Sequence, residues 1–325
     1  MVLFNNVSDD TVAEIGQMFT GSAYASSDVG AHTLTADGYE RPVTRSFLQA
    51  ELVCSLLDGE DLSILDIGCF NGALLVEFDR RLKSVDLHGF DVNDHLRATF
   101  PVKDNFRFWS SNIESIDGQF DVICMSHSIM YVQNIHRLMT QIRRLMKPDS
   151  VLFVQTPNIA KNPYYALMGD QYSYYTPNIL RNVFLYHGLE LSLVDNRWFP
   201  REIVGIARRH SYDADRDYSQ DAHIEQCLKY LDTIAMKLDD LSADSRIGVL
   251  GTTANAAFVD SRLGEKLDFF VDENHSRVGT RFRDKEVLHP RSLDDSDLLI
   301  VPYGESSRRI KRRLEDEYRG RFMVL

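Results

Sequence analysis

Cysteine is scarce in this chain of 325 residues, and its four cysteines, Cys54, Cys69, Cys124 and Cys227, are widely scattered. Their spacing matches neither a disulfide framework nor the closely paired ligands of a structural zinc site. The sequence therefore predicts buried thiols, a reducing compartment and no metal centre.

Long apolar runs are missing as well. No run reaches the roughly 18 residues that a membrane-spanning helix needs. The first ten residues include Asn5, Asn6, Asp9 and Asp10, which do not fit the apolar core of a secretory signal peptide. We therefore expect a cytoplasmic protein that does not enter a membrane.

Positive charge is in short supply, since 36 Lys and Arg residues face 48 Asp and Glu residues, for a formal net charge of -12. This balance argues against nonspecific nucleic-acid binding, which requires a positive surface to displace counterions from phosphates. It also argues against docking on an anionic membrane. We expect a small-molecule substrate and neither a nucleic-acid nor a membrane partner.

The most informative stretch that is present runs from Leu62 to Leu75. An apolar run of strand length contains Asp66 at its end, Gly68 and Gly72 bracket a tight turn, and a helical apolar pattern begins at Ala73. This order is typical of a nucleotide-binding crossover in an open parallel sheet, which binds ligands at the carboxyl ends of its strands. The glycines allow the backbone to approach a ligand closely.

Further strands follow in an order that fits such a sheet. A second strand, Val85–Phe90, ends at Asp91, whose carboxylate can accept hydrogen bonds from both hydroxyls of a ribose. Asp91 follows Asp66 by 25 positions (91 − 66), near the ~20-residue interval of this kind of unit. A solvated turn acid is the alternative role for Asp91. Third and fourth strands are predicted at Phe106–Trp109 and Phe120–His127.

Apolar spacing predicts helices at Thr11–Phe19, Phe47–Leu57 and Ile135–Met146. The last of these is expected to end at Lys147-Pro148-Asp149, before a fifth strand at Val151–Gln155. The predicted fold class is therefore α/β, with a parallel sheet flanked by helices.

In this order, residues 61–155 resemble the class I S-adenosylmethionine-dependent methyltransferases. The acid followed by Gly-x-x-x-Gly resembles their first motif, and Arg144–Val154 resembles their leucine-lysine-proline-glycine signature, with Asp149-Ser150 in place of the glycine pair. The resemblance implies a Rossmann-like core and S-adenosyl-L-methionine as cofactor. It implies cofactor-binding roles for Asp66, Gly68, Cys69, Asn71, Gly72, Asp91, Val92, Asn112, Ile113 and Ser126.

Two later regions resemble the sugar C-methyltransferases. One runs from Thr156 to Glu190; the other, from Ile247, is similar to their small Rossmann-like C-terminal domain. The resemblance implies a sugar or nucleotide-sugar acceptor. The expected organisation is an N-terminal substrate or lid segment (1–45), a cofactor-binding domain (46–210), a linker with a bridging helix (211–244) and a second, smaller Rossmann-like domain (245–325). Expected substrate contacts are Tyr24, His32, Gln171 and Tyr172.

The chain departs from those enzymes in two ways. It lacks their cysteine-rich zinc domain, and Gly169-Asp170-Gln171 replaces their His-Glu-His triplet. Methylation of carbon beside a ketone requires a base to remove a proton, and Asp170 is the one ionisable residue left in the triplet. His127, just after the fourth strand, is the second candidate base, because imidazole titrates near neutral pH. A turn acid and a hydrogen-bonded strand-end histidine are the alternative roles of the two residues.

The leading hypothesis is methyl transfer to oxygen or carbon of a sugar or nucleotide sugar. Two alternatives stay open: a methyltransferase for a non-sugar natural product, and a non-catalytic protein that kept the cofactor fold. The apolar stripe of Ile224–Leu241 either bridges the two domains or pairs with a second copy, so a homodimer also stays open.

The ribose role of Asp91 yields a first prediction. Asp91→Ala should weaken binding of S-adenosylmethionine by about 1.5–3 kcal/mol, the scale of hydrogen bonds to a charged group. Titration calorimetry measures this difference directly. An unchanged affinity would show that Asp91 does not hold the ribose.

Overall fold

The computed structural model describes residues 3–4, 9–21, 33–34, 36–57, 59–194, 197–210, 223–242 and 245–325. The chain divides into a large unit, Met1–Asn158 with Asp170–Asp221, and a small unit, Ile159–Gly169 with Ala222–Leu325. The segment Ile159–Gly169 therefore belongs to the small unit, although the sequence analysis assigned it to the cofactor-binding domain. The chain passes from the large unit to the small unit at Ile159 and returns at Asp170, and the periodicity of the sequence does not predict this crossing.

The large unit is built on a seven-stranded sheet with the strand order β10-β11-β8-β7-β4-β5-β6. Every neighbouring pair is parallel except the two pairs made by β11, which runs antiparallel to β8 and β10. The strands are β4 (Leu62–Ile67), β5 (Val85–Asp91), β6 (Phe106–Ser110), β7 (Phe120–Ser126), β8 (Met146–Pro157), β10 (Leu189–Leu193) and β11 (Glu202–Arg209). This arrangement confirms the predicted α/β fold.

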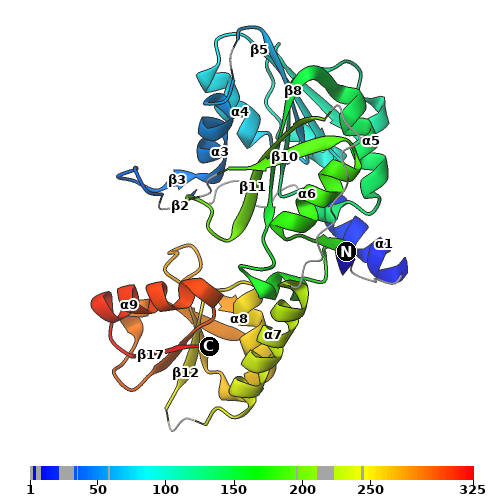
Figure 1. The fold of residues 1–325 in the computed structure, drawn as a ribbon. Helices are drawn as coiled ribbons and strands as arrows, with labels where there is room; N and C mark the ends of the chain where they lie inside the picture. The colour runs from blue at the N-terminus through cyan, green and yellow to red at the C-terminus, as the bar shows by residue number, and fades with distance from the viewer. Residues whose placement is uncertain are drawn as a thin grey trace. The chain divides into compact units, whose positions relative to one another are not determined.

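Helices cover both faces of this sheet. Figure 1 shows α3 and α4 on one side and α5 and α6 on the other. The described helices are α1 (Asp9–Thr20), α3 (Arg45–Cys54), α4 (Ala73–Arg81), α5 (Ile135–Leu145) and α6 (Pro177–Tyr186), with short 3-10 turns η2 (Asp94–Ala98), η3 (Ile113–Ser115) and η4 (Ile129–Tyr131). Two-residue strands pair as β1 (Leu3–Phe4) with β9 (Ser173–Tyr174) and β2 (Thr33–Leu34) with β3 (Val43–Thr44).

Helix α5 shows how local sequence produces these elements. Asn134 caps it by accepting a hydrogen bond from the Arg137 N–H at 2.9 Å, which satisfies one free donor of the first turn. Its buried side chains recur at helical spacing and face the sheet: Ile135, Leu138, Met139, Ile142 and Leu145. The charged residues of the helix fall between them.

The segment after α5 differs from the prediction. Lys147-Pro148-Asp149 lies within β8 and is not a turn before it. The ladder between β7 and β8 shifts register here, because Phe120 pairs with Met146 and Val122 already pairs with Val151. Such a bulge accommodates a proline, which has no N–H to donate to the ladder.

The small unit repeats the α/β plan on a six-stranded sheet of order β14-β15-β13-β12-β16-β17. All its pairs are parallel except β14 with β15. The strands are β12 (Ile247–Leu250), β13 (Phe269–Val271), β14 (Arg281–Phe282), β15 (Lys285–Leu288), β16 (Leu298–Val301) and β17 (Arg321–Val324), and the helices are α7 (His223–Asp239), α8 (Ala254–Leu263) and α9 (Ser307–Glu317). Short 3-10 turns of this unit include η5 (Pro163–Leu167).

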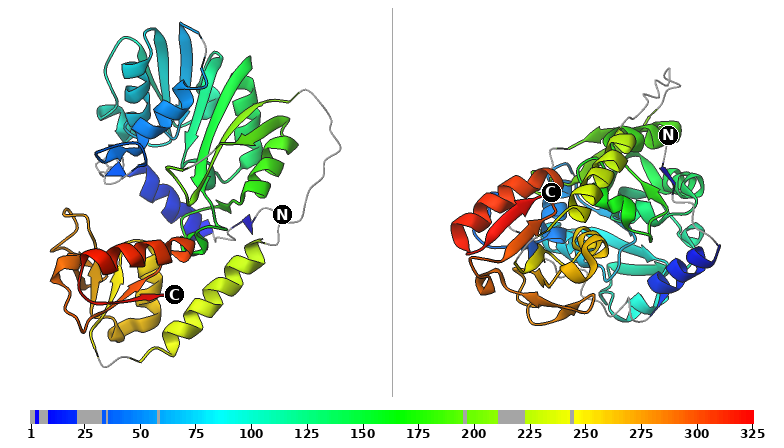
Figure 2. Two further views of the ribbon diagram at one scale, coloured as in Figure 1. Left: turned by 60° about the vertical axis from the view of Figure 1, so that its left-hand side comes forward. Right: turned by 90° about the horizontal axis from the view of Figure 1, so that it is seen from below.

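Helix α7 is one continuous helix of the small unit (Figure 2). Its residues Ile234 and Leu238 are buried and pack with Ile247 and Val249 of β12 in the core of this unit. Part of the apolar stripe of α7, for which bridging and pairing were the two predicted roles, therefore packs into the core of the small unit.

In both sheets the chain starts on a central strand, extends to one side and later returns to the other side. The central strands are β4, between β5 and β7, and β12, between β13 and β16. Open α/β sheets bind ligands in the crevice outside the carboxyl ends of the strands at such a reversal. A cavity lies at this place in each unit.

Candidate active site

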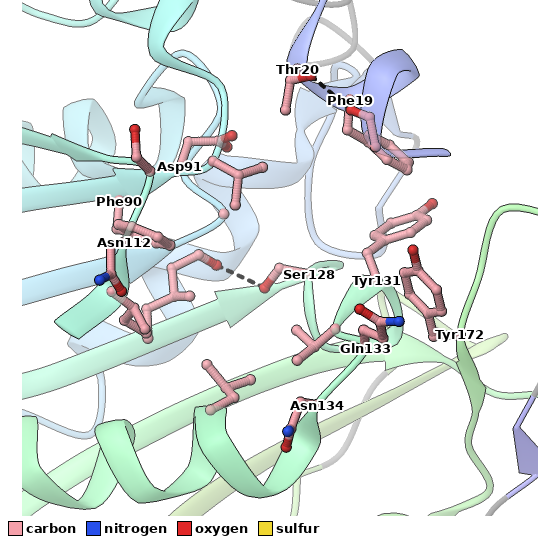
Figure 3. Close-up of a pocket in the computed structure, with 18 of the residues that line it drawn as sticks. Phe19, Thr20, Phe90, Asp91, Asn112, Ser128, Tyr131, Gln133, Asn134 and Tyr172 are labelled. Carbon is pink, nitrogen blue, oxygen red and sulfur yellow. Dashed lines mark hydrogen bonds between the residues drawn. The ribbon is translucent and has the colours of Figure 1, made fainter. Parts of the chain in front are cut away.

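A cavity of about 530 Å3 opens at the carboxyl ends of the central strands of the large unit. Figure 3 shows Asp91 and Asn112 on one side of it and Phe19, Tyr131 and Tyr172 on another. The lining residues come from segments far apart in the chain: Gly16, Phe19, Thr20, Ile67, Gly68, Phe70, Phe90, Asp91, Val92, Ser111, Asn112, Ile113, His127, Ser128, Tyr131, Val132, Gln133, Asn134, Arg137, Leu138 and Tyr172.

The turn after β4 is held by close backbone contacts. Gly68 has a φ of +80°, and a Cβ at this position would lie 2.5 Å from the Cβ of Ser128. The Gly68 N–H donates to the carbonyl of Phe90 at 2.7 Å, and the Ser128 hydroxyl donates to the carbonyl of Ile67 at 2.7 Å. Only glycine meets both the backbone conformation and the lack of space.

Asp91 is the last residue of β5, and its carboxylate contacts the backbone of the turn after β4. Its Oδ2 accepts from the Phe70 N–H at 3.1 Å and its Oδ1 accepts from the Asn93 N–H at 3.0 Å. We call Gly68, Phe90, Asp91 and Asn93 the glycine–aspartate turn. Burial raises the pKa of Asp91, against the opposing effect of the backbone N–H groups. Each carboxylate oxygen keeps a further lone pair, so the group can still accept bonds from a ligand.

Asp66 directly precedes Ile67 and Gly68 of the cavity wall and does not itself line the cavity. The residue is buried, and its Oδ1 has no hydrogen-bond partner within the described part of the chain. Burial, with a smaller effect from the charge of Asp91, raises the pKa of Asp66 to about 7. An unpaired buried carboxyl group of this kind is costly unless a ligand or a proton compensates it.

The remaining predicted cofactor residues divide into two groups. Val92, Asn112 and Ile113 line the cavity, and the Asn112 side chain also accepts from the Glu114 N–H at 3.0 Å. Four others do not line it and serve the turn and the interior: Cys69, Asn71, Gly72 and Ser126. Oδ1 of Asn71 accepts from the N–H of Ala73, the first residue of α4, at 3.2 Å, and the Ser126 hydroxyl oxygen accepts from Gln49 at 2.6 Å.

Gly72 has a packing role. Its φ is +77°, and a Cβ there would lie 2.9 Å from atoms of Phe100 and Pro101. This close approach places the start of α4 against the segment that follows η2. Of the two predicted glycines, Gly68 lines the cavity and Gly72 allows close packing.

Helix α1 lies in the segment 1–45 that the sequence predicted as a substrate or lid segment, but none of its cavity-lining residues was named. The buried Asn93 side chain donates to the carbonyls of Phe19 at 2.8 Å and Gly21 at 3.1 Å, which fixes the end of α1 to the glycine–aspartate turn. The Phe19 ring lies 4.6 Å from that of Tyr131, measured between centroids. The signal available in the sequence was an asparagine two residues after Asp91.

His127 lines the cavity from the end of β7 and has a φ of +53°. Its Nε2 lies 3.0 Å from Oε2 of Glu202 and 2.9 Å from Nη1 of Arg45. Burial would raise the pKa of Glu202, but the charges and hydrogen bonds of His127 and Arg45 outweigh it and lower that pKa. Neither Arg45 nor Glu202 was identified from the sequence, because α3 and β11 are distant from His127 along the chain.

The other predicted residues are placed differently. Asp170 and Gln171 do not line the cavity, although Tyr172 does. Gln171 is buried, and burial raises the pKa of Asp170, whose Oδ1 has no partner among the described residues. Tyr24 and His32 lie outside the described residues.

Among the described residues, no group of three or more His, Cys, Asp and Glu side chains could hold a metal ion. No described helix combines the length and apolarity that crossing a membrane requires.

Residues 39–194 match the family model described as a methyltransferase domain. This region is a methyltransferase domain. A ubiquinone biosynthesis O-methyltransferase of Rickettsia bellii is 24% identical over 135 residues, which cover 38% of this chain and 53% of that protein. A trans-aconitate 2-methyltransferase of Deinococcus radiodurans is 24% identical over 96 residues, covering 29% of this chain and 37% of that protein. The matched part of the chain thus spans about half of the first relative and about a third of the second.

Among solved structures, the CcbJ methyltransferase of Streptomyces caelestis is similar to this chain with a TM-score of 0.41 and 16% identity. The match covers 51% of this chain and 90% of that chain.

S-adenosylmethionine is the cofactor of this class of methyltransferase domain. The described residues fit it. Gly68 leaves room for close backbone approach, Asp91 offers two oxygens to a ribose, and Asn112 with Ile113 stands at the neighbouring strand end. Asp66 adds a buried carboxyl group beside the turn, whose ionised form would suit a cofactor that carries positive charge.

The burial of Asp66 in the methyltransferase domain yields a second prediction. Its pKa in the folded chain is raised above the ordinary value, so its stabilising contribution is complete at low pH and is lost as the pH rises to about 7. Asp66→Asn removes this loss. The free energy of unfolding of the variant minus that of wild type should therefore increase by about 2–3 kcal/mol from pH 5 to pH 7, since one pH unit corresponds to about 1.4 kcal/mol.

Urea unfolding followed by tryptophan fluorescence measures this gain, because both tryptophans, Trp109 and Trp198, belong to the large unit. Asp117→Asn, at an exposed acid of the same unit, is the matched control and should show a constant difference from wild type. A constant difference for Asp66→Asn as well would contradict the prediction.

Proposed function

We propose that this chain transfers a methyl group from S-adenosylmethionine to a hydroxyl oxygen of a small molecule, and that the acceptor is a nucleotide-linked sugar. The observation that carries the proposal is that Gly68, Asp91, Asn112 and His127 line one and the same cavity of the large unit. It brings the features expected of a cofactor site together with a group that can act as a base.

S-adenosylmethionine, when bound, supplies a methyl group on a positively charged sulfur. A hydroxyl is a poor nucleophile until its proton has a destination, and His127 at the cavity wall offers one. The bound cofactor would give up this methyl group to the acceptor oxygen and keep the electron pair of its carbon–sulfur bond. The hydroxyl proton moves to His127 and then to solvent.

Oxygen is favoured over carbon by the position of the two candidate bases. His127 lines the cavity, whereas Asp170, the ionisable residue left in the altered triplet, does not. The remaining task of the site is to hold the acceptor in line with the methyl group. Such orientation supplies about 7–11 kcal/mol in favourable cases.

The small unit supports a nucleotide-linked acceptor, because it contains a second glycine–aspartate turn. The Gly251 N–H donates to the carbonyl of Val271 at 2.7 Å, and Asp272 follows that residue. Oδ1 of Asp272 accepts from the Asn274 N–H at 2.9 Å, and its Oδ2 accepts from the Thr252 hydroxyl at 3.0 Å. The bonds made by Gly251 and Asn274 have counterparts at Gly68 and Asn93 in the large unit. The third bond differs, because the backbone N–H of Phe70, and not a hydroxyl, donates to Oδ2 of Asp91.

A cavity of about 250 Å3 adjoins this second turn. Gly251, Thr252 and Asp272 line it together with Arg313. Arg277 lies beside it and donates to the Thr252 hydroxyl at 2.9 Å. Arg313 is paired with Glu273, both of its Nη atoms donating to that carboxylate at 2.6 Å, so Arg277 is the guanidinium group that can bind phosphate. A carboxylate that can bind a ribose, with this guanidinium nearby, suits a nucleotide.

The curated relatives favour a second candidate function. Their names give ubiquinone biosynthesis and trans-aconitate as contexts, and neither is a sugar. Methyl transfer to a non-sugar small molecule is therefore the competing function. It assigns no acceptor role to the second glycine–aspartate turn.

S-adenosylmethionine labelled with carbon-13 in the methyl group tests the proposal. The full chain is incubated with nucleotide sugars and with carboxylic-acid and phenolic acceptors, and proton–carbon NMR identifies the methylated atom. We expect a methyl on oxygen of a nucleotide sugar. We also expect Asp272→Ala to raise the KM for that acceptor by about tenfold or more, with unchanged cofactor affinity.

A methyl on carbon would reinstate C-methylation. A labelled methyl group on a non-sugar acceptor, with the KM for that acceptor unchanged in Asp272→Ala, would favour the competing function. Cofactor binding without product from any acceptor would identify a non-catalytic protein.

The base role of His127 gives a separate prediction. His127→Ala should lower kcat by about 100-fold or more, because general acid–base groups contribute about 10²- to 10⁴-fold. Its affinity for S-adenosylmethionine, measured by calorimetry, should stay close to wild type. Equal turnover in variant and wild type would remove His127 from the mechanism.

A further inference from the structure

The second glycine–aspartate turn lies at the same place in its sheet as the first. Asp272 directly follows β13, and Asp91 ends β5, and both strands run parallel to the central strand of their sheet. Asp272 follows Gly251 by 21 positions (272 − 251), and Asp91 follows Gly68 by 23 positions (91 − 68). The first turn belongs to a domain whose cofactor, S-adenosylmethionine, contains a ribose. The equivalent position of Asp272 therefore favours a ribose at the second turn.

The described bonds of Asp272 leave one acceptor site on each carboxylate oxygen. Oδ1 accepts from the Asn274 N–H at 2.9 Å, and Oδ2 accepts from the Thr252 hydroxyl at 3.0 Å. An ionised carboxylate can accept about four hydrogen bonds, two on each oxygen. Asp272 also lines the cavity of the small unit. Two acceptor sites on neighbouring oxygens match the two neighbouring hydroxyls of a cis-diol, such as the 2′- and 3′-hydroxyls of ribose.

Arg277 adds a positive charge beside this carboxylate. Its Nη1 donates to the Thr252 hydroxyl at 2.9 Å, and the same hydroxyl donates to Asp272, so one side chain links the two charged groups. A guanidinium carries five N–H donors and binds phosphate oxygens well. The pairing of a carboxylate with a guanidinium therefore favours a diol that carries phosphate, as in a nucleotide, over the diol of an uncharged sugar.

Tyr303 distinguishes the second turn from a second cofactor site. Ser128 lies two residues after β7, and Tyr303 lies two residues after β16, the equivalent strand of the small sheet. A Cβ at Gly68 would collide with Ser128, and a Cβ at Gly251 would collide with the Tyr303 hydroxyl. Tyrosine is the larger side chain, and the cavity that it lines measures about 250 Å3, against about 530 Å3 in the large unit. The second turn therefore encloses less of its ligand, which suits a nucleotide that presents its sugar outside the cavity.

We propose that the small unit recognises its nucleotide through both hydroxyls of the ribose, with Asp272 as their common acceptor, so that the methyl group goes to a ribonucleotide-linked sugar. The link to methyl transfer rests on the proposed function, whereas the preference for ribose in binding does not. A 2′-deoxyribonucleotide lacks one of the two hydroxyls and leaves an oxygen of Asp272 without that bond. The loss of a hydrogen bond to a charged group weakens binding by about tenfold or more.

Titration calorimetry on the full chain measures this preference, with S-adenosylmethionine in excess to fill the cavity of the large unit. UDP, ADP and GDP are each compared with the 2′-deoxy form of the same nucleotide. We expect the preferred ribonucleotide to bind about tenfold or more tightly than its deoxy form. Equal affinities within every pair, or binding of none of these nucleotides, would overturn the proposal without any variant.

Mannose 1-phosphate tests the source of the diol, because it carries a cis-diol and a phosphate but neither ribose nor base. We expect its affinity to be lower than that of the preferred ribonucleotide. An equal affinity would show that the second turn recognises the diol of the sugar, and it would overturn the assignment to ribose.

Variants of Asp272 assign the preference to this carboxylate. Asp272→Ala should lower the affinity for the ribonucleotide to that for its deoxy form, so that the difference disappears. If the alanine variant fails to fold, Asp272→Asn keeps the shape of the side chain, accepts on one oxygen only and should reduce the difference. The matched control is Asp295→Ala, at an exposed acid of the small unit that does not line the cavity, and it should keep the wild-type difference. A ribose preference that persists in both Asp272 variants would overturn the proposal.

The labelled-methyl reaction separates this inference from the proposed function. A ribose preference in binding, with no labelled product from any acceptor, would reject the proposed function while the nucleotide site of the small unit stands. Labelled product formed with equal kcat/KM from a ribonucleotide sugar and from its 2′-deoxy counterpart would overturn the inference while the proposed function stands.

Discussion

The close approach of the backbone at Gly68 to the end of β5 and to the segment after β7 is the contact on which the site of the large unit depends. One hydrogen bond from Gly68 reaches Phe90, and the missing side chain leaves room for Ser128. These contacts hold three strand ends at one edge of the sheet. Asp91 and His127 reach the same cavity because their strands end beside this turn.

Two buried carboxyl groups in the large unit show how surroundings set the state of a side chain. Asp66 has an oxygen without a partner, and burial raises its pKa to about 7. Glu202 is also buried, yet Arg45 and His127 lower its pKa. The first group favours a proton or a cationic ligand, and the second stays ionised because charged partners surround it.

Local patterns predicted the elements of this fold well. The apolar run of β4, the helical spacing of α5 and the acid at the end of β5 each depend on neighbouring residues alone, and each is present in the structure. The glycine turn was also readable, because few other residues tolerate its backbone conformation. The segment around Pro148 was misread, since a bulge in a ladder depends on the partner strand.

The sequence by itself determined the α/β class, the glycine–aspartate turn and His127 as a candidate base, because these follow from residue types at short spacing. The tertiary structure alone decided which residues of α1 line the cavity, that Asp170 stays out of its wall, and that Arg45 and Glu202 meet His127. Those contacts join residues 82 and 75 positions apart in the chain. Pairing over such separations is fixed by strand order and by the reversal of β11, which no local pattern encodes.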